Sequence, residues 1–352
     1  MLMCAIQTII ISSFLACLVG LQGLCLGMMP ASAAEENHQP VLIDFSFDRP
    51  INAGVAPLVV AMTDSLFAAE GLSITTNVAA GSPEAIARVA AGTSEFALVD
   101  LNALIRFRDN GAPPVKAVFV LFNKSPYAIV ARKSRGIHAL ADLEGKTLGV
   151  AEGDLSLLLW PALANRNGIK LASIKQRKMS PAVREPMLSA GQVDAVTGFS
   201  YLSAVNLRDR GVPADDLVVL RFAEHGCEAY GFAIIVNPAF AARRPDAVKA
   251  FLRALTAGTT LAIRDPRHAV DAVLSRMEDG SRELELERLH TVIEDNILTS
   301  EVRRDGIGAV DPVRLERSIS DVGEAFKFNK RPSAADIFDN SFLPPAGDRL
   351  IN

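Results

Sequence analysis

The chain has very little cysteine for its length. It has four cysteines in 352 residues, and Cys4, Cys17 and Cys25 all lie near the amino terminus, which leaves Cys227 alone in the remainder. A single cysteine forms neither a disulfide within the chain nor a cysteine-based metal site, because each needs further sulfur atoms. This excludes a disulfide-stapled scaffold, and we expect Cys227 to be a small buried apolar residue.

Motifs for catalysis and nucleotide binding are also missing. The sequence has no H-E-x-x-H, no G-x-S-x-G, no Walker loop and no dinucleotide glycine fingerprint. Among the five histidines, only His225 stands beside other reactive side chains, Cys227 and Glu228 in "AEHGCEAYG". A nucleophilic or metal-binding role for this group stays an alternative, because residues two apart in a strand share a face. The main expectation is a protein that is not an enzyme, with no catalytic residue, metal or cofactor.

The chain also lacks a concentrated positive charge. The formal net charge is −4 and the isoelectric point is near 5.8. The basic runs, such as the one at residues 175–178, are short and are typical of a solvated face or turn. Nucleic acid is therefore not an expected partner, because phosphate binding needs a concentrated basic surface.

The amino-terminal segment has no acidic residue before Glu35 and is apolar, then rich in small residues. Ala31-Ser32-Ala33 has the A-x-A pattern of a signal-peptidase site, so residues 1–34 are expected to be a signal peptide of an exported protein. The segment contains no Lys or Arg, which keeps an uncleaved membrane anchor as an alternative. The expected location is therefore outside the cytoplasm, and the family resemblance described below implies the periplasm.

From Val41 onward, strand-like and helix-like segments alternate, which predicts an α/β fold with a parallel-type sheet covered by helices on both faces. Turns separate the segments, and Pro or Ser often stands at a helix start. Ser82, for example, is expected to be an N-cap with Pro83 at the first helical position. After residue 236 the pattern becomes helical. The expected strands are 41–47, 72–79, 96–99, 115–121, 127–131, 147–151, 195–197, 217–222 and 231–236, and the main expected helices are 56–70, 82–91, 100–111, 139–143, 156 onward, 181–190, 200–210, 245–264, 266–277, 282–296 and 312–326.

The order of these segments predicts two lobes. Residues 41–127 and 232–345 are expected to form the large lobe with a helical carboxyl-terminal tail, and residues 128–231 a small inserted lobe. The chain would thus cross between the lobes twice. Such an arrangement is a hinge, and the cleft between the lobes is the expected ligand site. We expect a monomer that closes on its ligand.

Small or polar residues follow several strands where helices begin. Free backbone N–H groups and the positive end of the helix dipole make such positions seats for polar or anionic groups. The candidate ligand-binding residues chosen on this basis, together with nearby aromatic rings, are Asn52, Gly54, Gly81, Ser82, Asp100, Asp154, Ser156, Ser180, Gly198, Phe199 and Tyr230. No arginine could be assigned to the cleft from the sequence.

Several segments resemble one protein family. "ALADLEGKTLGVAEGD", with Asp142, Gly145 and Lys146, is similar to the signature of type II periplasmic solute-binding proteins, as is "GQVDAVTGF". "GSPEAIARVAAGTSEFALVD" and "ADIFDNSFLP" are similar to the nitrate, sulfonate and taurine branch, which also contains binders of thiamine-pyrimidine precursors. The resemblance implies two lobes, each a mixed sheet flanked by helices, and a receptor that delivers a small molecule to the membrane permease of an ABC importer.

The resemblance leaves the ligand and two other functions open. The ligand could be a sulfonate, nitrate, a carboxylate or a pyrimidine-like molecule. A cofactor-free enzyme on the same fold, such as a lyase, is one alternative, and an anchored sensory module is another. The iron-dependent pyrimidine synthases of the superfamily carry a cysteine-rich motif, whereas this chain offers only Cys227 outside the leader, which argues against that enzymatic branch.

Overall fold

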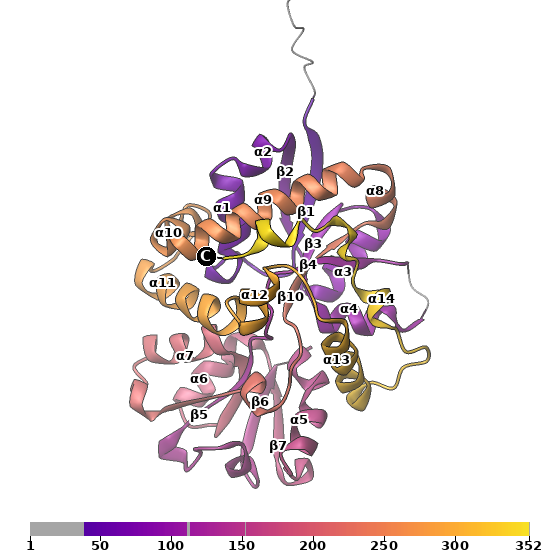
Figure 1. Cartoon of the computed structure of the whole chain (residues 1–352). Helices are drawn as coiled ribbons and strands as arrows, with labels where there is room; N and C mark the ends of the chain where they lie inside the picture. Colours follow the sequence, from indigo (N-terminus) through magenta and orange to yellow (C-terminus); the bar gives the residue numbers. More distant parts are fainter. Residues whose placement is uncertain (1–38, 111–112, 152, 352) are drawn as a thin grey trace, which may run out of the picture. The chain divides into compact units, whose positions relative to one another are not determined.

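The part of the chain that the structure describes contains two five-stranded sheets, each with flanking helices (Figure 1). The computed structural model describes residues 39–110, 113–151 and 153–351. The expected signal peptide, residues 1–34, lies outside the described residues. The first sheet has the strand order β2-β1-β3-β10-β4, with β1 Val41–Phe47, β2 Leu72–Val78, β3 Phe96–Asp100, β4 Lys116–Val120 and β10 Phe232–Val236.

The first sheet is mixed. β1 pairs in parallel with both β2 and β3, as the strand–helix alternation predicts. β10 runs antiparallel to β3 and β4, so the expectation of a parallel-type sheet is wrong there. The reason is that β10 enters the first sheet after the chain has returned from the second, instead of through a helical crossover from β3 or β4. The mixed sheet implied by the family resemblance is confirmed.

The second sheet contains a strand that the sequence did not reveal. Its order is β7-β6-β8-β5-β9, with β5 Tyr127–Arg132, β6 Thr147–Ala151, β7 Lys175–Met179, β8 Ala195–Phe199 and β9 Leu217–Arg221. β7 is "KQRKM", which lies at the sheet edge with its first four residues exposed. The apolar alternation that marks a strand is absent because neither face of this edge strand is buried. Of the two interpretations of residues 175–178, the solvated face is confirmed and the turn is wrong.

Most of the expected helices are present. The expected helix over residues 56–70 is instead two helices, because Ser65 adopts a left-handed backbone conformation with φ of 59° between them. The helices are α1 Ala56–Thr63, α2 Leu66–Ala69, α3 Ser82–Ala91, α4 Leu101–Phe107, α5 Trp160–Arg166, α6 Arg184–Ser189, α7 Ser200–Asp209, α8 Pro238–Arg243, α9 Pro245–Arg264, α10 Pro266–Leu274, α11 Arg282–Thr291, α12 Ser300–Asp305, α13 Pro312–Ala325 and α14 Ala334–Ile337.

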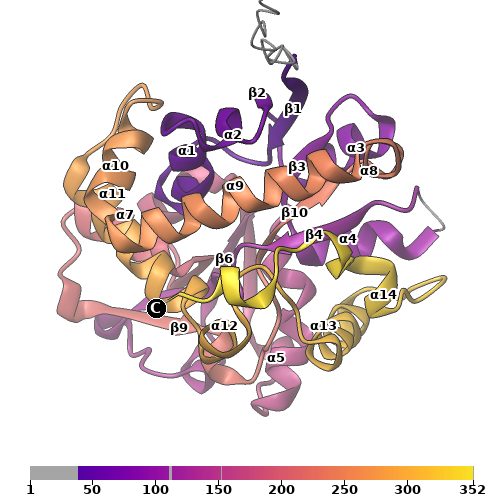
Figure 2. The same ribbon diagram turned by 45° about the horizontal axis from the view of Figure 1, so that its top comes forward.

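The carboxyl-terminal helices pack back onto both sheets. α9, the 20-residue helix seen lengthwise in Figure 2, packs against α1, α2 and β2 of the first half of the chain. α13 packs against α4, which follows β3 of the first sheet, and against α5, which follows β6 of the second. Leu104, Leu163 and Leu315 from these three helices belong to one buried apolar cluster.

Two segments connect the sheets, one between β4 and β5 and one between β9 and β10. The first sheet thus draws its strands from residues 41–120 and 232–236, and the second from residues 127–221. The segments run side by side, because the Ser125 N–H donates to the Ala229 carbonyl at 3.0 Å and the Gly231 N–H to the Phe122 carbonyl at 2.9 Å. The lobe limits given above and the closing motion remain predictions.

Candidate functional site

A cleft of about 350 Å³ lies where strands of both sheets end. The carboxyl ends of parallel strands are where open α/β sheets bind ligands, because helix N-termini and loops meet there. The first sheet contributes the segments that follow β1 and β2 and the end of β3, and the second contributes the segment after β6, the start of α6 and the end of β8. The residues that line the cleft are Asp48, Arg49, Ala80, Gly81, Ser82, Pro83, Asp100, Ala151, Gly153, Asp154, Leu155, Pro181, Arg184 and Phe199.

Asp48 and Arg49 directly follow β1 and form a two-point ion pair. Arg49 Nε donates to Asp48 Oδ1 and Nη2 to Oδ2, both at 2.6 Å. The Asp48 side chain is fully buried and that of Arg49 is 17% exposed. Burial alone would lower the pKa of the guanidinium, but the adjacent Asp48 carboxylate outweighs it and raises the pKa. Arg49 therefore stays charged at one side of the cleft.

The guanidinium of Arg49 also lies on aromatic rings from both sheets. Its central carbon is 3.7 Å from the ring centroid of Phe232 on β10 and 5.1 Å from that of Phe199 on β8. A cation over an aromatic face is attracted by the ring quadrupole, and desolvation strengthens that attraction. Arg49 thus links the two sheets across the cleft.

Ser82 uses its hydroxyl within the protein. Ser82 Oγ donates to Asp48 Oδ2 at 2.5 Å and accepts from the Asp100 backbone N–H at 3.0 Å. The expected role of Ser82 as an N-cap is wrong, because α3 begins at Ser82 itself and Gly81, with φ of 115°, occupies the cap position. The hydroxyl instead fixes the orientation of a cleft carboxylate.

Asp100 ends β3 and is completely buried. Its Oδ1 accepts from the N–H of Asn102 at 2.8 Å, which caps α4, and its Oδ2 accepts from the Tyr127 hydroxyl on β5. Burial raises the pKa of Asp100 to about 6, against the hydrogen bonds from Tyr127 and Asn102, which lower it. Burial and the neighbouring Asp100 likewise raise the pKa of Tyr127. The Tyr127 hydroxyl therefore keeps its proton and shares it with the Asp100 carboxyl in a hydrogen bond at the base of the cleft.

The second sheet contributes Asp154 and Arg184. Asp154 Oδ1 accepts from the backbone N–H of Ser156 at 2.9 Å and from its hydroxyl at 2.6 Å, while Oδ2 accepts from Thr197. Arg184 Nη1 lies 3.5 Å from Asp154 Oδ2, with its side chain 17% exposed. Arg184 Nε is buried without a hydrogen-bond partner among the described residues. A buried donor without a partner is uncommon in native proteins, and in a cleft it indicates a place for a ligand acceptor.

The cleft as a whole is close to charge-balanced. It is lined by two arginines and three aspartates, and Asp48 and Asp154 each already face one of the arginines. The third carboxyl, Asp100, has a raised pKa. The cleft therefore offers both hydrogen-bond donors and acceptors without an excess of positive charge.

The structure brings five of the expected site residues together in the cleft lining: Gly81, Ser82, Asp100, Asp154 and Phe199. Ser156 is fully buried behind Asp154 and touches the cleft only through that carboxylate. Asn52 caps a short 3-10 turn by accepting from the Gly54 N–H at 2.8 Å. Gly54 allows close approach of α7, because a Cβ there would lie 2.8 Å from the Tyr201 hydroxyl oxygen.

Three other expected site residues lie outside the cleft lining. Ser180 is exposed before the 3-10 turn that leads to α6. Gly198 is required by packing, since a Cβ would meet the Ser203 side chain. Tyr230 is buried, and its hydroxyl donates to Glu301 at 2.7 Å and accepts from the Asp311 N–H. Their roles as ligand contacts remain proposals.

The cleft residues that the sequence did not reveal include three charged ones, Asp48, Arg49 and Arg184. Asp48 and Arg49 stand immediately after a strongly apolar strand, where a charged pair is a weak signal for a strand-end site. Arg184 gave no local signal, since it begins a helix that is separated from β6 by more than one element. Its place in the cleft depends on how the second sheet folds.

The Cys227 group lies elsewhere. Cys227 is buried, and burial raises the pKa of its thiol to about 12. Together with Glu228 and Arg314, it lines a different cavity, of about 330 Å³.

In the part of the chain that the structure describes, no three His, Cys, Asp or Glu side chains are grouped as a metal site needs. No described helix has the length and apolar character to span a bilayer.

Comparison with known proteins adds a family and a fold. A family model described as "NMT1/THI5 like" matches residues 52–269. The chain is 24% identical over 332 residues to the riboflavin-binding protein RibY of Chloroflexus aurantiacus, which covers 90% of each chain. It is 23% identical to the 4-amino-5-hydroxymethyl-2-methylpyrimidine phosphate synthase of Schizosaccharomyces pombe, over 60% of this chain and 62% of that one.

Solved structures with the same fold include two periplasmic binding proteins. The aliphatic sulphonate-binding protein SsuA of Escherichia coli superposes with a TM-score of 0.71 at 15% identity, over 87% of this chain and 94% of that one. The nitrate-binding protein NrtA of Synechocystis PCC 6803 gives 0.66 at 12% identity, over 88% and 91%. The expected fold, that of periplasmic solute-binding proteins, is confirmed.

Proposed function

The chain belongs to the NMT1/THI5-like family, and on that premise we propose that it is the solute-binding subunit of an ABC importer. The observation that carries the proposal is the cleft, in which polar side chains from the ends of both sheets converge on a cavity of about 350 Å³. A ligand held by groups from both sheets would favour a closed arrangement of the two lobes, because the ligand contacts both lobes only when the lobes are close together.

Of the ligand classes that the sequence leaves open, the charges of the cleft favour a pyrimidine-like nitrogen heterocycle. A sulfonate, nitrate or carboxylate would be favoured by an arginine without a competing carboxylate, but Asp48 and Asp154 already face Arg49 and Arg184 and would also repel an anion held by backbone N–H groups. A heterocycle carries both donors and acceptors, which carboxylates and guanidinium groups can pair with simultaneously. Phe199 supplies a ring for stacking at the cleft wall.

Two relatives support this choice. One is named for riboflavin and the other for an aminopyrimidine phosphate, and both molecules contain nitrogen heterocycles. The periplasmic neighbours SsuA and NrtA support export to the periplasm, and the solute-binding role proposed above implies partnership with a membrane permease. We extend the proposal accordingly to a periplasmic monomer that docks on permease subunits.

A thermal-shift screen tests the ligand class. The protein without residues 1–34 is mixed in turn with nitrate, an alkanesulfonate, benzoate, an aminopyrimidine and riboflavin. A ligand at 100 times its dissociation constant adds about 2.7 kcal/mol to the free energy of unfolding, a clear rise in melting temperature. The heterocycles should give the largest rise, and Arg184→Met should reduce it while Arg317→Met, outside the cleft, should not. A rise with nitrate or the sulfonate alone would contradict the heterocycle.

A cofactor-free enzyme is the second candidate, and one observation favours it. The Asp100–Tyr127 pair holds a proton at the cleft base with a carboxyl pKa of about 6, a value suited to proton transfer near neutral pH. One relative is a synthase. Incubation of the protein with each heterocycle, followed by mass spectrometry of the small molecules, distinguishes the two: a receptor returns the ligand unchanged, whereas an enzyme yields a product. Mass spectrometry of the amino terminus separates a cleaved receptor from an anchored sensory module.

A further inference from the structure

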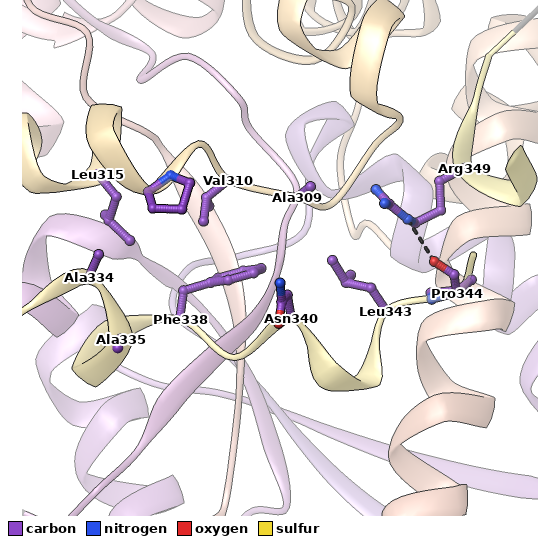
Figure 3. Close-up of a pocket in the computed structure, with 11 residues that line it drawn as sticks. Ala309, Val310, Leu315, Ala334, Ala335, Phe338, Asn340, Leu343, Pro344 and Arg349 are labelled. Carbon is purple, nitrogen blue, oxygen red and sulfur yellow. Dashed lines mark hydrogen bonds between the residues drawn. The ribbon is translucent and has the colours of Figure 1, made fainter. Parts of the chain in front are cut away.

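Apart from the cleft and the Cys227 cavity, a cavity of about 380 Å³ lies between the segment that leads into α13 and the carboxyl-terminal tail. It shares no lining residue with the cleft. Most of its wall is apolar, with Val310, Leu315, Phe338 and Leu343 around the space in Figure 3. Its volume lies within the range of pockets that hold small organic molecules, roughly 300–1,000 Å³.

Arg349 stands at one end of this cavity and is only 7% exposed. Its Nε donates to the Pro344 carbonyl at 2.9 Å and its Nη1 to the Ile307 carbonyl at 2.7 Å. Among the described residues, no carboxylate lies within ion-pair distance of Arg349, and its Nη2 has no hydrogen-bond partner. In Figure 3 the guanidinium reaches from the tail toward Ala309.

A buried guanidinium without a counter-ion is unusual. Burial of a charge costs free energy unless an opposite charge or several hydrogen bonds compensate it. Each of the arginines that line the cleft or the Cys227 cavity has a carboxylate within 3.5 Å: Arg49, Arg184, Arg314 and Arg317. Burial lowers the pKa of Arg349, and the more distant Asp305 only partly opposes this effect. An anion bound in the cavity would supply the missing partner.

We propose that this cavity is a second ligand site, which binds a small carboxylic acid with an aliphatic or aromatic body. The carboxylate pairs with Arg349, and the body lies against Phe338, Val310 and Leu315. The apolar wall at one end and the cation at the other match the two halves of such a molecule, whereas inorganic anions would leave the apolar wall in contact with water. The site does not depend on the function proposed for the cleft.

Isothermal titration of the protein without residues 1–34 tests the site with octanoate and 3-phenylpropionate as probes and octanamide as the uncharged match. One acid should bind at a single site more tightly than about 1 mM. Arg349→Gln keeps an amide donor but removes the charge, and it should weaken the acid about tenfold or more. Ala335→Phe fills the cavity from an exposed position on α14 and leaves Arg349 in place, so it should also abolish binding.

The controls separate this site from the cleft and from general surface charge. Arg184→Met, in the cleft, and Arg253→Gln, on the surface beside Glu70, should leave acid binding unchanged. The proposal is overturned if neither acid binds, if octanamide binds as well as octanoate, or if binding persists in both Arg349→Gln and Ala335→Phe. Loss of acid binding in Arg184→Met would also overturn it, because the acid would then occupy the cleft.

Discussion

The arginine–carboxylate pairs of the cleft differ in their partners from the pair where the chain crosses between the sheets. In the crossing region, Arg314 on α13 donates through Nε to the Glu228 carbonyl at 2.6 Å and through Nη2 to the Asn123 carbonyl at 2.5 Å. Its Nη1 reaches Asn123 Oδ1 and Glu301 Oε2, and its central carbon lies 4.0 Å from the Tyr230 ring centroid.

The partners distinguish the two regions. Arg314 binds backbone carbonyls from both crossing segments, so every direction of its guanidinium is used by the protein. Arg184 in the cleft faces one carboxylate at 3.5 Å and keeps an unpartnered Nε. Arg314 therefore fixes the crossing, because each of its three guanidinium nitrogens is bonded within the protein, whereas Arg184 keeps a donor available to a ligand.

The largest effect is expected when Arg314, the arginine of the crossing region, is replaced. Arg314→Met should lower the free energy of unfolding by about 3–5 kcal/mol, because Glu301, Asn123 and two backbone carbonyls lose their buried partner. Urea denaturation measures the loss. Arg317→Met, one turn away on the same helix, removes an exposed pair with Glu228 and should cost about 1 kcal/mol or less. Equal losses in the two variants would show that Arg314 does not hold the crossing.

Asp100 should make stability depend on pH in one direction. Its pKa rises from 3.8 to about 6 on folding, so the folded chain binds the proton more tightly than the unfolded chain does. The stabilisation from the protonated carboxyl is fully present below pH 4 and is lost as pH rises through 6, a fall of about 3 kcal/mol. Asp100→Asn should remove this fall, which urea denaturation from pH 4 to 7 measures in parallel with the wild type. The same dependence of the free energy of unfolding on pH in wild type and Asp100→Asn would contradict the role given to Asp100.

Replacement of Arg184 should lower ligand affinity and leave stability almost unchanged, unlike replacement of Arg314. Asp154 keeps its bonds from Ser156 and Thr197, so Arg184→Met should change stability by less than about 1 kcal/mol. Affinity for the heterocycle with the largest thermal shift should fall by about 1–3 kcal/mol, since a hydrogen bond from a charged donor is lost. Titration calorimetry and urea denaturation on the same protein give both values. A large loss of stability with unchanged affinity would place Arg184 with the structural arginines.

Ser82 and Ser156 test whether the cleft carboxylates that their hydroxyl groups hold are ligand contacts. Ser82→Ala leaves the Asp100 N–H without its Ser82 partner and removes one hydrogen bond from Asp48, which keeps its ion pair with Arg49, so the variant should cost about 1–2 kcal/mol of stability. Ser156→Ala should cost about 1 kcal/mol or less, because the Ser156 N–H still holds Asp154. Each hydroxyl orients a cleft carboxylate, so both variants should also weaken the ligand in calorimetry. Wild-type affinity in both would mean that the carboxylates are not ligand contacts.

The site was only partly predictable because its groups are of two kinds. Gly81, Ser82, Asp100 and Asp154 stand at strand-to-helix junctions, which local sequence patterns reveal through caps and turn residues. Arg49 and Arg184 resemble ordinary solvated arginines in the sequence, since nothing within a few residues shows that Phe232 or Asp154 will lie beside them. Pairing between residues distant in sequence depends on how the sheets pack.

The sequence by itself determined the α/β class and the positions of the apolar strands and most helices, because burial imposes a period on each segment that is visible locally. It did not determine β7, whose exposed edge position requires no apolar residue. Only the tertiary structure decided that β10 is antiparallel, that Arg49 links rings from both sheets, and that Arg314 ties the two crossings together. Each of these depends on where the chain returns after a long excursion, which no local pattern encodes.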